Sequence, residues 1–229
     1  MGIARALLGL GLIAALAGCE MDANGQARGF LSGFESPGTS GGRDALSKPG
    51  DGPPPVPRAA VAGGAVVVAG PRGYCVDPVT VESDDDTGFA VLASCRILGG
   101  PGAGPNVAPA LVTVTVGAPE PAPVLPTAET FARLSGGAAR PGRSGGDLVV
   151  AQMQTGGERV LPNGDPRYWR GAFLVANRLV SLALYAPEGS SLAGDDGGQF
   201  LGSVRRAIRA GSPAGGALTG RPASGPSGG

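Results

Sequence analysis

Residues 169–185 read Trp-Arg-Gly-Ala-Phe-Leu-Val-Ala-Asn-Arg-Leu-Val-Ser-Leu-Ala-Leu-Tyr, and this stretch decides the fold. Two apolar runs rich in strand-forming residues flank the pair Asn177-Arg178. Asn tolerates a positive φ, so this pair suits the tight turn of a two-stranded hairpin. The sequence therefore predicts two antiparallel strands joined by a turn at Asn177-Arg178.

A helix is predicted after this hairpin, over residues 198–209. Asp196 can cap the start of this helix, and Gln199, three residues later, fits the capping-box pattern. Gly211 follows the end of the helix. One face of the helix collects four apolar side chains, namely Phe200, Leu201, Val204 and Ile208. We expect this face to pack on the sheet that contains the hairpin.

Shorter apolar runs on the N-terminal side predict further strands at residues 65–69, 89–98, 111–116 and 147–154. A short helix is predicted at residues 127–134. Strands and helices do not alternate regularly, which favours the α+β class over a parallel α/β fold. The predicted fold is a mostly antiparallel sheet with a short helix and a packed C-terminal helix, flanked by disordered Gly/Pro-rich segments.

The N-terminal residues have the pattern that predicts an export signal. Arg5 is followed by an apolar block of about 15 residues, shorter than the roughly 20 that a membrane span needs. The block ends in Leu16-Ala17-Gly18-Cys19. These residues resemble the lipobox of bacterial lipoproteins. The resemblance implies cleavage before Cys19, a diacylglyceryl group on its thiol and stable attachment to a membrane facing the periplasm.

Glu20 follows the Cys in place of the Asp associated with inner-membrane retention in enteric lipoproteins, which slightly favours the outer membrane.

The composition separates one ordered region from two Gly/Pro-rich ends. The chain has 229 residues, with 43 Gly and 22 Pro, a combined share of about 28% that is typical of disordered segments. Most of the Gly/Pro-rich sequence cannot bury enough apolar surface to offset its ordering entropy. We therefore predict a signal peptide at 1–18, a tether at 19–60, one domain at 61–210 and a disordered tail at 211–229.

Charge argues against nucleic acid as a partner. The chain has 18 basic and 18 acidic residues, and removal of residues 1–18 takes away only Arg5. The mature chain thus has 17 basic against 18 acidic side chains, without the positive excess that phosphate backbones attract. Nucleotide binding is not expected either, since Gly137 opens a loop with P-loop glycine spacing in which Arg143 replaces the required Lys.

The cysteines predict one disulfide. With Cys19 assigned to lipid, Cys75 and Cys95 remain, and an even remainder in an oxidising compartment favours a bridge. A redox pair is the alternative, although such pairs usually sit closer together, in a Cys-X-X-Cys turn.

The chain has no His, the usual general base and the commonest transition-metal ligand. The single Lys48 lies in the predicted tether. An enzyme would have to use paired carboxylates, such as Asp165 or Glu158 with Asp147. No catalytic motif and no cofactor are expected.

The densest acidic cluster runs from Glu82 to Asp86 and could offer Glu82, Asp84 and Asp86 to a hard cation. It fails as an EF-hand loop, because Thr87 stands where that loop needs Gly. The alternative is a solvated turn before a strand.

A closing hairpin followed by a C-terminal helix resembles the PsbP-like α/β/α sandwich, which exported bacterial lipoproteins also use. The expected function is a lipid-anchored, non-enzymatic envelope module that binds or positions an envelope protein or glycan. A carboxylate-dependent envelope hydrolase and a cation-binding structural module are the alternatives.

Overall fold

The computed structural model describes residues 53–136, 138–142 and 147–213. The predicted signal peptide, Cys19, most of the predicted tether and the tail from residue 214 lie outside the described residues. Among the described residues, no helix is long and apolar enough to cross a membrane.

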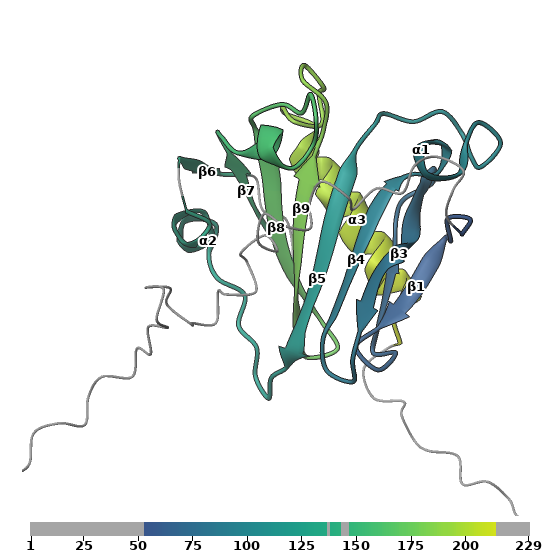
Figure 1. The fold of residues 1–229 in the computed structure, drawn as a ribbon. Helices are drawn as coiled ribbons and strands as arrows, with labels where there is room; N and C mark the ends of the chain where they lie inside the picture. The colour runs from purple at the N-terminus through teal and green to yellow at the C-terminus, as the bar shows by residue number, and fades with distance from the viewer. Residues whose placement is uncertain (1–52, 137, 143–146, 214–229) are drawn as a thin grey trace, which may run out of the picture. The chain divides into compact units, whose positions relative to one another are not determined.

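A seven-stranded sheet forms the centre of the domain, and every neighbouring pair of its strands is antiparallel (Figure 1). From one edge to the other the strands are β3 (Tyr74–Ser83), β4 (Gly88–Ser94), β5 (Leu111–Pro119), β9 (Arg178–Tyr185), β8 (Tyr168–Val175), β7 (Leu148–Met153) and β6 (Ala139–Pro141). A separate hairpin pairs β1 (Arg58–Val61) with β2 (Val66–Ala69). The α+β class with a mostly antiparallel sheet is confirmed.

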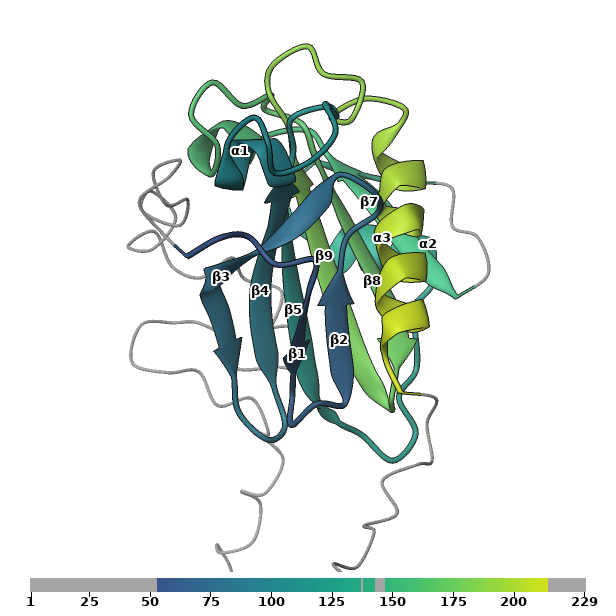
Figure 2. The ribbon, with the colours of Figure 1, turned by 90° about the vertical axis from the view of Figure 1, so that its right-hand side faces the viewer.

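One face of the sheet is covered by α3 (Gly197–Gly211) and the β1–β2 hairpin (Figure 2). Leu201, Val204 and Ile208 of α3 are fully buried in this core. Burial of each such side chain contributes roughly 1.5–3 kcal/mol. Phe200 is only partly buried and lies edge-on to Tyr74, with ring centroids 4.8 Å apart. The predicted packing of the C-terminal helix on the sheet is therefore confirmed.

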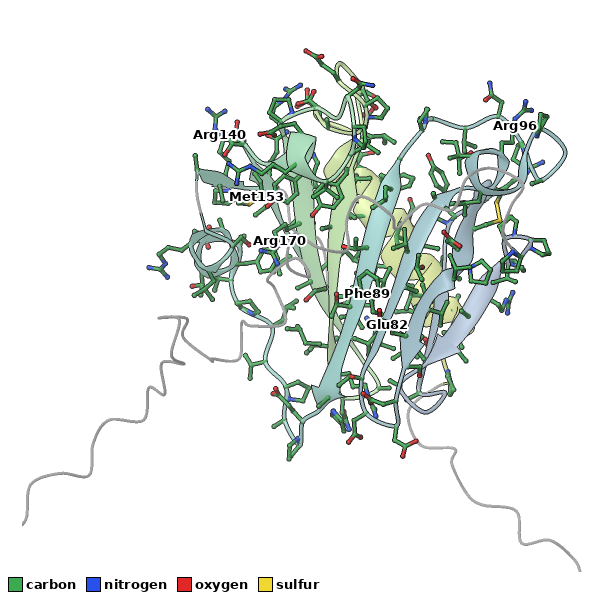
Figure 3. The ribbon with its side chains drawn as sticks, in the orientation of Figure 1. Glu82, Phe89, Arg96, Arg140, Met153 and Arg170 are labelled. Carbon is green, nitrogen blue, oxygen red and sulfur yellow. A yellow bond between two sulfur atoms is a disulfide. The ribbon has the colours of Figure 1, made fainter. Side chains whose placement is uncertain are left out.

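The other face is turned toward the viewer in Figure 3, which shows Phe89 and Arg170 on it. Helix α2 (Ala128–Leu134) lies at the β7 side of the sheet and buries Phe131. Nearer the centre of the sheet, Tyr168 and Tyr185 stack at 5.0 Å beside a second small apolar cluster. Strands β4, β5 and β9 thus bury apolar side chains on this second face as well, namely Val91, Leu111, Ala183 and Tyr185.

The predicted hairpin is present, but its turn lies one residue earlier than expected. Ala176 and Asn177 occupy the two turn positions with φ of 51° and 55°. Arg178 instead begins β9, opposite Val175. Two consecutive positive φ angles match the twist of the flanking strands.

The predicted strand over residues 89–98 is wrong at its end. Strand β4 stops at Ser94, and the short helix α1 (Cys95–Gly99) follows. An apolar run of this length fits a strand or a buried helical turn equally well, so the pattern alone could not place the boundary.

Asp196 occupies the predicted N-cap position of α3, but its side chain makes no capping hydrogen bond. Its backbone is already helical, with φ −80° and ψ −18°, whereas a capping side chain needs an extended backbone. The regular structure extends slightly beyond the predicted domain limits of 61 and 210, because β1 begins at Arg58 and α3 ends at Gly211.

Candidate binding cleft

A cleft of about 860 Å³ lies between residues 198–206 of α3 and strands β7 and β8. Ten residues line it: Leu148, Gln152, Trp169, Asp195, Gly198, Gln199, Gly202, Ser203, Arg205 and Arg206. Apolar groups and polar side chains contribute together, which is the usual composition of a site that binds and orients a small ligand.

The floor of the cleft depends on close approach between α3 and Trp169. Trp169 is buried, with 8% of the residue exposed. A Cβ atom at Gly197 would lie 2.2 Å from Cδ1 of Trp169 and 2.3 Å from the Leu192 carbonyl oxygen. Only Gly fits at that position without a shift of the helix, so this residue sets the spacing between helix and strand.

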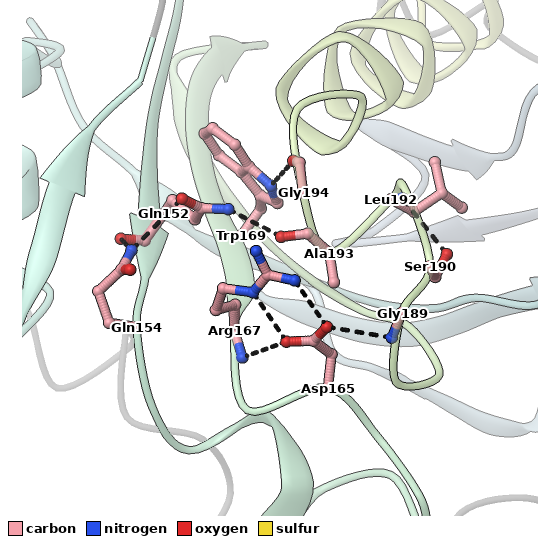
Figure 4. Close-up of polar contacts among 10 residues, drawn as sticks. All are labelled: Gln152, Gln154, Asp165, Arg167, Trp169, Gly189, Ser190, Leu192, Ala193 and Gly194. Carbon is pink, nitrogen blue, oxygen red and sulfur yellow. Dashed lines mark hydrogen bonds and ion pairs between the residues drawn. The ribbon is translucent and has the colours of Figure 1, made fainter.

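The loop that leads into α3 is held over the strands by hydrogen bonds (Figure 4). The Trp169 Nε1–H donates to the Gly194 carbonyl at 2.8 Å, and Gln152 Nε2 donates to the Ala193 carbonyl at 2.8 Å. Both donors sit on rigid neighbouring strands, in register with each other. The start of α3 is therefore positioned by the sheet.

Asp165 supports the same loop from the side. Its carboxylate accepts two hydrogen bonds from the Arg167 guanidinium, at 3.0 and 2.9 Å, and one from the Arg167 backbone N–H. The Gly189 N–H adds a longer bond of 3.3 Å. Arg167 in particular, and these backbone donors, lower the pKa of Asp165 to about 2. The carboxylate is ionised at neutral pH and joins two loops.

The rim of the cleft carries polar and charged groups from α3. Ser203 Oγ accepts a hydrogen bond from Arg206 at 2.8 Å and donates to the Gln199 carbonyl at 3.3 Å. Arg205 pairs with Asp147 through NH1, while its Nε–H is buried and has no hydrogen-bond partner. An unsatisfied buried donor costs about 1–3 kcal/mol.

The carboxylates considered for catalysis have separate partners. Asp147 pairs with Arg205 and Arg209 of α3, while Asp165 is held by Arg167. Glu158 accepts a hydrogen bond from the Gly156 N–H at 2.9 Å. Each carboxylate thus has a local structural role.

The acidic cluster forms the turn between β3 and β4. Asp84 accepts hydrogen bonds from the Thr87 N–H and hydroxyl and from the Asp86 N–H, and these bonds lower its pKa. Asp86 faces Arg178, with 3.8 Å between Oδ1 and NH2. In the described part of the chain, no three acidic, His or Cys side chains lie together as metal ligands. Cation binding by Glu82, Asp84 and Asp86 stays a prediction.

Cys75 and Cys95 form a disulfide, with their Cα atoms 4.9 Å apart. Cys75 lies on edge strand β3, and Cys95 starts α1 directly after the neighbouring strand β4. The predicted bridge is therefore confirmed.

Sequence reasoning did not find the cleft, because its lining comes from two strands, a loop and a helix. One signal was available: Gly198 and Gly202 lie one turn apart inside a helix, where each costs about 1 kcal/mol relative to Ala.

No known protein family, no curated protein and no solved structure matches this chain.

Proposed function

We propose that this protein is a lipid-anchored module of the bacterial cell envelope that binds an envelope component in the cleft beside α3. The cleft carries the proposal: it joins an apolar floor to a rim of hydrogen-bonding side chains on a helix that the sheet positions. Such preorganised concave surfaces bind ligands with little ordering cost.

The lipobox supports the anchoring part of the proposal. Cys19 would carry the acyl chains and hold the domain at a membrane facing the periplasm, with the outer membrane slightly favoured. The disulfide fits this oxidising compartment. The role is binding or positioning, with an envelope protein or glycan as the partner and no cofactor.

The anchoring is tested by growing cells with an alkyne-labelled fatty acid and comparing wild type with Cys19→Ala. Wild type should be labelled and should sediment with membranes, and the variant should lose both properties. Equal labelling of the two proteins would contradict the proposed anchor.

The binding is tested by crosslinking in intact cells. A Cβ at Gly202 meets its neighbours at ordinary contact distances of 3.8 and 3.9 Å, so Gly202→Leu should fill the cleft while the fold is kept. Gly102→Leu is the matched control, because no atom lies within 4 Å of its Cβ position. The crosslinked partner should disappear only in Gly202→Leu. Identical partners in all three proteins would show that the cleft is not the binding site.

A further inference from the structure

The chain contains two Asp–Pro peptide bonds, Asp77–Pro78 and Asp165–Pro166. In such a pair the Asp side chain can attack the carbonyl carbon of its own residue, because the product is a five-membered ring. The proline nitrogen is the leaving group, and it belongs to a tertiary amide without an N–H. Both Asp residues are buried, with 3% of Asp77 and 4% of Asp165 exposed. The local contacts of each carboxyl group therefore decide whether its peptide bond is reactive.

The contacts of the two carboxyl groups differ. The Arg167 guanidinium holds both oxygens of Asp165 and lowers the pKa of that carboxyl to about 2 (Figure 4). Asp77 instead accepts one hydrogen bond, from the Val79 N–H to Oδ1 at 3.2 Å, while its Oδ2 is buried without a hydrogen-bond partner. None of the ion pairs between described residues includes Asp77. One oxygen of Asp77 is thus free to react, whereas Asp165 is a fully bound anion.

The carbonyl group of Asp77 is held by a hydroxyl group. Thr80 Oγ1 donates to the Asp77 carbonyl oxygen at 2.8 Å and accepts from the Val91 N–H at 2.9 Å. The second bond fixes the direction of the hydroxyl proton. The register between β3 and β4 shifts after Asp77, and this irregularity lets the Thr80 side chain stand between the two strands. A donor at this distance stabilises the negative charge that develops on a carbonyl oxygen under attack.

We propose that the Asp77–Pro78 peptide bond is a self-cleavage site. In the neutral form of the carboxyl group, Oδ2 of Asp77 attacks the carbonyl carbon, and the bond from that carbon to the Pro78 nitrogen breaks. The carboxyl proton moves to this nitrogen, which leaves as an amine, and Asp77 becomes a cyclic anhydride. One water molecule then opens the anhydride to two carboxyl groups. Thr80 stabilises the carbonyl oxygen during the attack, and the intramolecular geometry replaces a bimolecular encounter.

The two fragments stay together after cleavage. The first ends at Asp77 and contains Cys75, and the second begins at Pro78 and contains Cys95, so the disulfide joins them. Strands β1 and β2 belong to the first fragment and contribute buried residues to the main core. The cleaved domain should therefore keep its fold, and a lipid on Cys19 would hold the second fragment through the disulfide.

Incubation of the full chain in detergent and mildly acidic buffer tests the proposal, because the neutral carboxyl is the reacting form. Samples are compared on denaturing gels with and without a reductant, and the new N-terminus is identified by mass spectrometry. We expect a fragment that begins at Pro78 and separates from the first fragment only after reduction. Absence of this fragment would overturn the proposal.

Unfolded protein in urea at the same acidity is the reference for ordinary Asp–Pro lability. Folding should accelerate cleavage at Asp77–Pro78 at least tenfold, and it should slow cleavage at Asp165–Pro166. A folded chain that cleaves at Asp77–Pro78 no faster than the unfolded chain would show that the structure does not promote the reaction, and the proposal would fail.

Variants assign the roles of the side chains. Asp77→Asn should abolish cleavage, whereas Asp165→Asn, the matched control, should leave the yield of the Pro78 fragment unchanged. Thr80→Val should slow cleavage at least tenfold, because the donor to the carbonyl oxygen is lost, and Thr80→Ser should restore the wild-type rate. Thermal unfolding checks that each variant is folded. Wild-type cleavage rates in folded Asp77→Asn or in folded Thr80→Val would contradict the proposal.

Discussion

Replacement of Asp165 by Asn should destabilise the protein and change how its stability depends on pH. Asp165 is 4% exposed and holds Arg167 and the Gly189 loop, which together support the start of α3. Asn keeps the size of the side chain but removes the charge that these donors bind. The substitution should leave the packing almost unchanged. The loss of stability therefore measures the contribution of the charge.

The magnitude follows from the pKa of Asp165, which falls from 3.8 to about 2 on folding. This difference corresponds to about 2.4 kcal/mol, and the 45% exposure of Arg167 reduces it through solvent screening to about 1–2 kcal/mol. A lowered pKa stabilises the folded state above the unfolded value, and the contribution disappears as the pH falls through the folded value. The effect should thus be complete above about pH 5 and should shrink between pH 4 and 2.

Urea unfolding of wild type and Asp165→Asn at pH 7, 4 and 3 measures this difference directly. Asp85→Asn is the matched control, since Asp85 is exposed, and it should change stability by less than about 0.5 kcal/mol. An Asp165→Asn loss that stays constant from pH 7 to pH 3, or no loss at pH 7, would refute the ionic role of Asp165.

Three further changes in stability are expected, each measurable by denaturant unfolding. The double variant Cys75→Ala/Cys95→Ala should lose about 3 kcal/mol, because the bridge closes a loop with a sequence separation of 20; equal stability of the two proteins would contradict this. Gly197→Ala should cost about 2 kcal/mol through overpacking against Trp169, while Gly102→Ala should have almost no effect. Ala176→Gly should add about 0.5 kcal/mol, since Gly removes the cost of a positive φ; a clear loss would show that the turn is not strained.

The sequence predicted the central hairpin, the C-terminal helix and the disulfide, because each has a strong local signature. The hairpin has two β-forming runs around an Asn, and the helix has an apolar face. The exact turn was missed because Ala176, a residue with no preference for positive φ, takes the first turn position. Pairing of β8 with β9 along their whole length decides this register.

Edge strand β3 was not predicted as a whole, for a physical reason. Pro78 and the acidic residues at its end interrupt the apolar pattern, although both are tolerated on an edge strand. The cleft was beyond prediction because its shape depends on where α3 crosses β7 and β8. That crossing is set by the contact of Gly197 with Trp169, which joins residues 28 positions apart.

Binding in the cleft is the central claim, and site-specific photo-crosslinking in living cells tests it most directly. A photoreactive amino acid would replace Gln199, which is exposed on the rim of the cleft, or Arg133, which is exposed on α2. A specific adduct from position 199 and none from position 133 is the predicted result. The same adducts from both positions, or none from position 199, would contradict the claim that this cleft holds the ligand.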